Sequence, residues 1–70
     1  MAMVEAPITG TVWKIQVAVG DQVREEDELV ILEAMKSEIP IEAEDDGTVA
    51  EIRVEEGQAV QQGDVLVVLS

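Results

Sequence analysis

The chain has 70 residues, of which 47% are hydrophobic, and it carries 16 acidic against four basic side chains, for a net charge of −12. This charge argues against nucleic acid as a partner, because phosphate binding requires clustered Lys and Arg. The sequence contains no Cys and no His, which excludes disulfides, thiolate–imidazole metal sites and Ser-His or Cys-His nucleophiles.

The length predicts a single domain over residues 1–70 with a small hydrophobic core. Its apolar residues are mostly Val and Ile, whose branched side chains favour pleated sheets. No apolar run reaches the length of a signal peptide or a membrane span. We therefore expect no membrane partner and a cytoplasmic location.

The first strand predicted from the alternation of apolar residues covers residues 13–19. Its buried face is assigned to every second residue, namely Trp13, Ile15, Val17 and Val19. Gly20-Asp21 then supplies a turn that tolerates positive φ. Residues 29–32 form a continuous apolar run, which is typical of a central strand covered on both faces. No window of the sequence fits an amphipathic helix.

Residues 29–43 predict a hairpin with Met35-Lys36 as its two-residue loop. Its cross-strand pairs are Val30 with Ile41, Leu32 with Ile39, Glu33 with Glu38, and Ala34 with Ser37. A slip of one residue would set Leu32 against a polar residue or a proline, so the apolar pattern fixes the register. Two-residue turns usually need positive φ, which is costly for Met35 and Lys36. Local rules often fail where function overrides stability, yet these residues alone also allow an ordinary solvated lysine on a slightly longer loop.

The sequence repeats itself at an offset of 37 positions. Residues 10–33 align with residues 47–70 at 11 identities over 24 positions. Two copies predict a pseudo-two-fold domain in which each half covers the apolar face of the other, since a solenoid requires at least three units. In the second copy Ala50, Ile52 and Val54 are assigned to the buried face, and residues 65–69 to a second central strand. The hairpin tip lies between the copies.

The tetrapeptide Glu33-Ala34-Met35-Lys36 resembles the attachment motif of biotinyl, or biotin carboxyl carrier, domains of the biotin/lipoyl attachment family. The resemblance covers essentially the whole chain. It includes a resemblance to the stand-alone members of the family. It also includes Ala6-Pro7 and Gly10-Thr11-Val12 at an opening strand, Gly20-Asp21-Gln22-Val23, residues 29–36, Gly47-Thr48-Val49 and Gly63-Asp64-Val65-Leu66. The implied fold is all-β, a flattened barrel or sandwich of two four-stranded sheets with pseudo-two-fold symmetry. The modified lysine would lie on a hairpin at one end.

The resemblance implies that a biotin protein ligase activates biotin as an acyl-adenylate and that the amine of Lys36 attacks it to form an amide. Ala34, Met35 and Ser37 would be the attachment flanks, with Met35 read by the ligase or packed beside the biotin ring. The arm would carry carboxybiotin from a biotin carboxylase to a carboxyltransferase site of a biotin-dependent carboxylase such as an acyl-CoA carboxylase. The chain itself would be a carrier and not an enzyme, leaving the reactivity to its cofactor.

This chain departs from the family pattern at two places. Ser37 replaces the Met that commonly follows the lysine, which bears on how carboxylase partners handle the arm more than on attachment. Glu26 stands where the second repeat has Gly63 and where the family often has Gly. If that turn needs positive φ, Glu26 costs about 1 kcal/mol.

Two other functions are compatible with the same fold. A lipoyl carrier of a 2-oxo acid dehydrogenase complex typically has Asp before the lysine and Ala after it, unlike Met35 and Ser37. An unmodified structural module has no reason to keep Glu-Ala-Met-Lys at a hairpin tip.

Lys14, the only competing lysine, falls within a predicted strand. Trp13 is expected in the core or at its rim with a bonded indole N–H.

Overall fold

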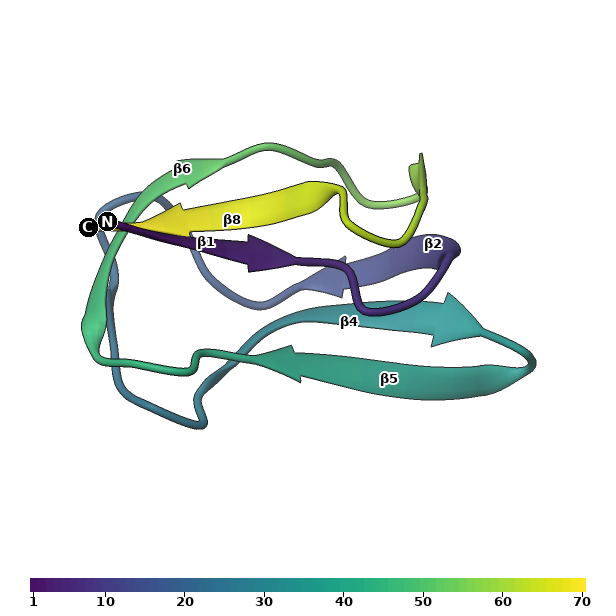
Figure 1. The fold of residues 1–70 in the computed structure, drawn as a ribbon, viewed down its shortest axis with the longest axis horizontal. Coiled ribbons are helices and arrows are strands. Elements are labelled where there is room, and N and C mark those ends of the chain that lie inside the picture. Colours follow the sequence, from purple (N-terminus) through teal and green to yellow (C-terminus); the bar gives the residue numbers. More distant parts are fainter.

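The computed structural model describes all 70 residues and consists of eight β-strands without a helix. The strands are β1 (Ala2–Glu5), β2 (Gly10–Ile15), β3 (Gln22–Val23), β4 (Glu28–Ala34), β5 (Ser37–Glu42), β6 (Gly47–Ile52), β7 (Ala59–Val60) and β8 (Val65–Leu69). They form two antiparallel four-stranded sheets, in the orders β1-β8-β6-β3 and β5-β4-β2-β7 (Figure 1). The predicted all-β sandwich is therefore confirmed. The chain has no helix that is long and apolar enough to cross a membrane.

The two sheets are related by the 37-residue offset. Leu32 pairs with Ile39 between β4 and β5, and the equivalent residues Leu69 and Ala2 pair between β8 and β1. The offset also relates Ile31–Pro40 to Val68–Met3 and Val30–Ile41 to Val67–Val4. The pseudo-two-fold repeat thus begins earlier than the predicted residue 10 and includes β1, whose counterpart is the second strand of the hairpin.

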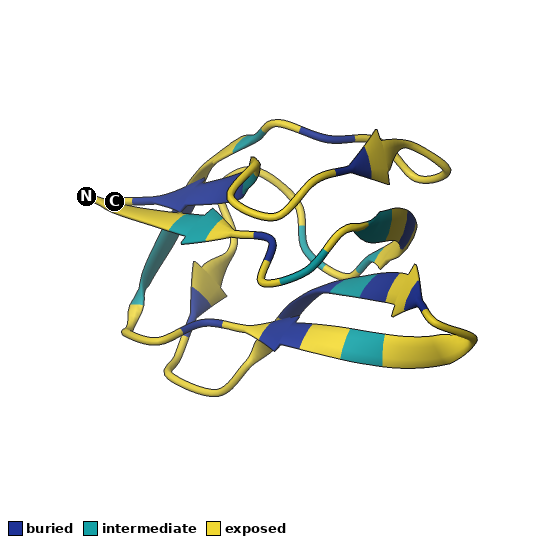
Figure 2. Ribbon diagram, turned by 45° about the vertical axis from the view of Figure 1, so that its right-hand side comes forward, coloured by how far each residue is buried: buried dark blue, intermediate teal, exposed yellow.

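The hydrophobic core lies between the two sheets and contains no buried polar side chain (Figure 2). Its largest fully buried side chains are Leu29, Leu32, Leu66, Val12, Val30, Val49, Val60 and Val67. As predicted, the continuous apolar runs form inner strands, β4 and β8. The predicted cover on both faces holds for β8 but only in part for β4, whose outer face carries half-buried Ile31 and exposed Glu33. The equal contribution of the two repeats explains how so short a chain encloses a core, since each half buries the apolar side chains of the other.

The predicted buried face of the first long strand is wrong at Trp13 and Val19, whose side chains are 45% and 62% exposed. Ala50 in the second copy is exposed as well. The cause at Trp13 and Ala50 is a β-bulge in β2 between Val12 and Lys14 and an equivalent one in β6, because an extra residue shifts the alternation of faces. Val19 is exposed because β2 ends at Ile15, earlier than the predicted residue 19. Val12 enters the core in place of Trp13.

The exposed position of Trp13 also corrects the expectation of a core or rim residue with a bonded indole N–H. No hydrogen bond involves its side chain, and the Lys14 ammonium lies 5.6 Å from the centre of its ring. The opening segment needs a correction too. Ala6-Pro7 does not belong to a strand but connects β1 to β2.

The tight turns use the backbone freedom that the sequence predicts. Gly20 and Gly57 have φ of +98° and +90°. The turn before β4 places Glu26 at φ +76°, and its equivalent Gly63 has φ +93°. A glutamate therefore occupies a left-handed position that glycine fills in the other half, which is the strained arrangement anticipated for this turn.

We predict that Glu26→Gly raises the free energy of unfolding by about 1 kcal/mol, because glycine removes the left-handed strain. Urea denaturation followed by circular dichroism measures the change. Glu26→Gln is the matched control, since it removes the charge and keeps the strained backbone. An equal gain from both variants would assign the effect to charge repulsion and contradict the strain at this turn.

Candidate functional site

The hairpin of β4 and β5 turns at Met35 and Lys36, which have φ of +52° and +63°. Two consecutive positive φ values are the signature of the turn whose twist matches a β-hairpin, although Asn and Gly are its usual residues. The observed cross-strand pairs are the predicted ones, namely Val30 with Ile41, Leu32 with Ile39, Glu33 with Glu38, and Ala34 with Ser37. Each of the two tip residues therefore occupies a conformation that costs roughly 1 kcal/mol or more.

The base of this turn is anchored in the rest of the fold. Leu32 is fully buried and Ala34 is 6% exposed. Gly10 in β2 lies so close to the hairpin that an added Cβ would be 2.6 Å from the Glu33 carbonyl oxygen and 3.1 Å from Ala34 Cβ. The sequence places Gly10 at the start of the repeat and in the opening strand that the family resemblance implies. Its role in holding the hairpin base against β2 depends on a close approach between strands that no sequence pattern reveals.

The side chains at the tip point into solvent. Met35 is 85% exposed, and Lys36 and Ser37 are exposed as well. Lys36 makes no hydrogen bond or ion pair, since the single ion pair of the chain joins Arg53 to Glu51 at 2.8 Å. Its amino group is therefore accessible from solvent. Lys14 differs because it lies within β2 and its ammonium is placed over an indole ring.

The tip lies at the end of the molecule opposite both termini (Figure 1). It is carried by two strands of seven and six residues that are continuous with the core. A lysine in this place has an unbranched aliphatic stem and a primary amine, which is a nucleophile when deprotonated and can be acylated. The structure brings together Ala34, Met35, Lys36 and Ser37, as the hairpin register predicted.

Comparisons with known proteins agree with this geometry. The sequence profile of the Biotin_lipoyl family, described as "Biotin-requiring enzyme", matches residues 1–69. A biotin/lipoyl attachment protein of Bacillus subtilis is 46% identical over 41 residues, which are 59% of this chain and 56% of that protein. A putative urea carboxylase of Emericella nidulans is 46% identical over 44 residues, 63% of this chain and 4% of the fungal protein. The chain thus spans little more than half of the shorter relative and a small part of the longer one.

Solved structures show the same relationship. The urea carboxylase of Kluyveromyces lactis superposes with a TM-score of 0.94 and 36% identity over 99% of this chain and 6% of its own. A single-chain, multi-domain long-chain acyl-CoA carboxylase superposes with a TM-score of 0.89 and 32% identity, over 94% of this chain and 7% of the carboxylase. The family match covers nearly every residue, and the chain therefore belongs to the Biotin_lipoyl family of biotin-requiring enzymes.

Proposed function

We propose that this chain is a biotin carboxyl carrier and that Lys36 is the residue to which biotin is attached. The observation that carries the proposal is the place of Lys36, an unpaired amine at the exposed tip of a hairpin whose backbone adopts positive φ at two non-glycine residues. Ordinary hairpins avoid this cost by using Asn and Gly. Met35 and Lys36 are expected at this turn, in spite of the cost, if their side chains are needed for function.

The residues around the tip fit the attachment of biotin through an amide. The stem of Lys36 would become part of a long arm, and Ala34 anchors the base of that arm in the fold. When bound, biotin supplies a ureido nitrogen that can accept and release a carboxyl group. The chain contributes the tether, which raises the local concentration of the cofactor at each site it visits. The modifying partner would be a biotin protein ligase, and the sites visited would be a biotin carboxylase and a carboxyltransferase.

Biotin is favoured over lipoate by two observations. The flanks Met35 and Ser37 differ from the Asp and Ala that typically surround a lipoylated lysine. The similar solved structures are also named as carboxylases, a urea carboxylase and a long-chain acyl-CoA carboxylase. An unmodified structural module would gain nothing from the strained turn.

The carrier role is tested by supplying the biotinylated chain with a biotin carboxylase, ATP and ¹⁴C-bicarbonate. We expect radioactivity that co-purifies with the chain at neutral pH and is released by acid, as is typical of carboxybiotin. The chain prepared without biotin should stay unlabelled. A biotinylated chain that remains unlabelled while free biotin is carboxylated in the same reaction would contradict the carrier role.

Met35 is expected to contribute to recognition by the ligase, because it is a large apolar side chain with 85% of its surface in solvent. We predict that Met35→Thr lowers the rate of biotinylation by about tenfold, the loss of one good apolar contact, and leaves the chain folded. The rate is measured by mass spectrometry at a fixed ligase concentration. Met35→Asn is the control. Because Asn tolerates positive φ, this variant removes the Met35 side chain without adding strain to the backbone of the turn. Wild-type rates for both variants would exclude a role of Met35 in attachment.

A further inference from the structure

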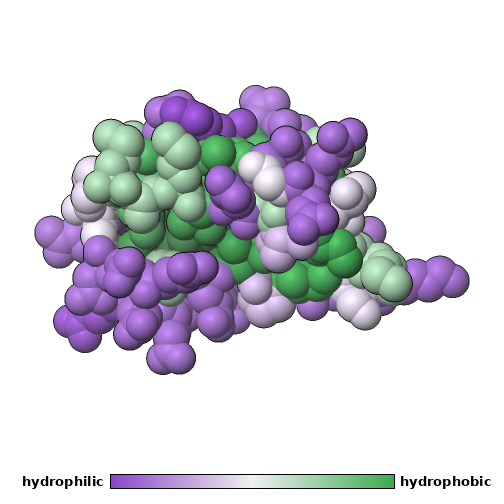
Figure 3. Space-filling view, in the orientation of Figure 1, coloured by the Kyte–Doolittle hydropathy of each residue, from purple (hydrophilic) through white to green (hydrophobic).

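A groove of about 920 Å³ runs between β1 and β5, which are one edge strand from each sheet. Its floor is apolar and includes Ala6, Ile41, Ala43 and Leu69, each no more than 7% exposed. Apolar side chains extend across the middle of this face, and hydrophilic ones gather along its lower left side (Figure 3). The groove is distinct from the hairpin tip, since none of its lining residues lies between residues 26 and 40.

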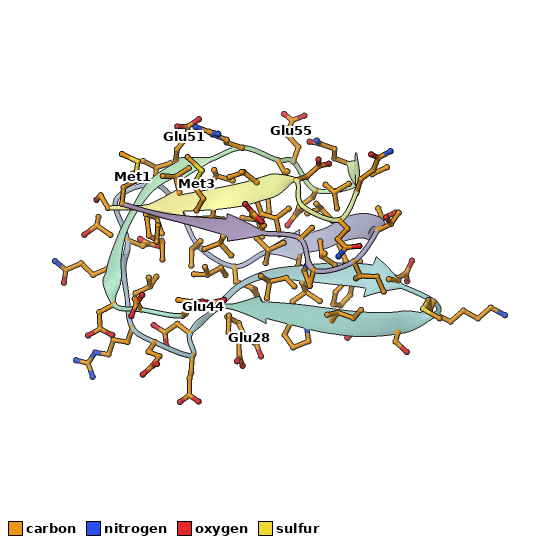
Figure 4. The ribbon with its side chains drawn as sticks, viewed as in Figure 1. Met1, Met3, Glu28, Glu44, Glu51 and Glu55 are labelled. Atoms are coloured by element: carbon orange, nitrogen blue, oxygen red, sulfur yellow. The ribbon has the colours of Figure 1, made fainter.

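The groove is electrically asymmetric although the fold around it is symmetric. On the β5 side the lining residues include Glu25, Glu26, Glu44 and Asp45, whereas their equivalents at the 37-residue offset are Gln62, Gly63, Pro7 and Ile8. The same turns therefore form without these charges in the other half, so the fold does not require them. None of the four carboxylates makes an ion pair or accepts a hydrogen bond within the chain. Figure 4 labels Glu44, one of these four residues, just beyond the end of β5.

The β1 side of the groove offers a free strand edge. β1 pairs with β8 along one side only and ends its sheet. It contains no proline, whereas the other edge strand, β5, carries Pro40, which has no backbone N–H. Proteins usually cover or interrupt such edges, because the unpaired backbone groups are a template for another strand. A second copy of this chain is a poor occupant, since both copies would carry a net charge of −12.

We propose that the groove binds an extended segment of a partner protein in which apolar and basic residues alternate. The backbone of that segment pairs with β1, as in strand addition to a sheet edge. Its apolar side chains pack along the floor of the groove, whose accessible apolar surface comes from Met3, Val4 and Pro40. Its basic side chains reach the carboxylates of Glu44 and Asp45 and their neighbours. This docking surface goes beyond the proposed carrier function and does not depend on the modification of Lys36.

The test uses the ¹⁵N-labelled Lys36→Arg chain and three eight-residue peptides that alternate Lys with Val, Glu with Val, or Lys with Gly. We expect the Lys-Val peptide to shift the amide resonances of β1 and of the groove and to bind at least tenfold more tightly than the other two. The double variant Glu44→Gln/Asp45→Asn should weaken binding about fivefold, as expected for the loss of two exposed charge pairs. The matched control is Glu51→Gln/Glu55→Gln, at the opposite side of the molecule (Figure 4), which should change affinity less than about twofold.

Three results would overturn the docking surface. Equal binding of the Lys-Gly peptide would show that charge alone attracts the probe and that the apolar floor has no part. Equal weakening by the two double variants would show that the attraction follows the net charge. An absence of shifts in β1 with the Lys-Val peptide would exclude the groove. The Lys36→Arg chain cannot carry biotin on Lys36, so none of these outcomes bears on the proposed carrier function.

Discussion

Lys36→Arg is expected to abolish biotinylation completely while leaving the fold unchanged. The guanidinium stays protonated at physiological pH and is not a nucleophile, so it cannot form the amide. The positive charge is kept, and the side chain at position 36 is exposed without a hydrogen bond or ion pair, so its replacement removes no contact. The variant is co-expressed with a biotin protein ligase and probed with labelled streptavidin, and its thermal unfolding is compared with that of the wild type.

The matched control is Lys14→Arg, which replaces the only other lysine of the chain. It should be biotinylated as fully as the wild type, because Lys14 lies within β2 and away from the hairpin tip. Residual streptavidin binding by Lys36→Arg, or its loss in Lys14→Arg, would contradict the assignment of a single attachment lysine at the tip.

Leu32→Ala is expected to lower the free energy of unfolding by about 2–5 kcal/mol, the range for truncating a buried leucine. Leu32 is fully buried and pairs with Ile39 at the base of the hairpin. A core in a chain of this size rarely supplies more than about 3–5 kcal/mol, so this loss is comparable with the whole stability. Urea denaturation followed by circular dichroism should show a largely unfolded variant at 37 °C.

Ile31→Ala provides the comparison, because Ile31 is the neighbouring residue on the opposite face of β4 and is only half-buried. We expect less than half of the destabilisation, in proportion to the apolar surface that Ile31 hides. Losses of equal size at both positions would mean that the hairpin does not owe its stability to the face that packs into the core.

The sequence predicts the hairpin closely because its register has one apolar solution. Leu32 and Val30 each meet an isoleucine only when the turn is Met35-Lys36, and the structure has this pairing. The repeat likewise predicts the inner strands, since both copies contain an apolar run too continuous for an exposed strand. These features depend on where apolar residues fall along each strand, which can be read from a single sequence.

The wrong predictions of the fold have two physical origins, irregular backbone in β2 and weak sequence identity between the repeats around β1. The bulge beside Val12 exchanges the faces of β2, and alternation alone cannot locate an extra residue. Alternation therefore predicts a buried Trp13, whereas 45% of its surface is exposed. The repeat does not predict strand β1, because residues 1–9 share only two identities with residues 38–46. These identities are Glu5 with Glu42 and Ala6 with Ala43.

The candidate site was only partly accessible from the sequence. The register placed Lys36 at a strained tip, and the resemblance of Ala34, Met35 and Ser37 to an attachment motif suggested its chemistry. The support from Gly10 depends on a 2.6 Å approach between strands distant in sequence. The groove between β1 and β5 is likewise formed by segments that meet only when the two repeats pack together.

The most direct test of the carrier assignment is the intact mass of the chain after co-expression with a biotin protein ligase and biotin, followed by peptide mapping. We expect one biotinyl group per chain, located on Lys36. An unmodified chain under conditions in which the ligase modifies a known substrate, or a single lipoyl group on Lys36 after parallel expression with a lipoate ligase, would contradict it.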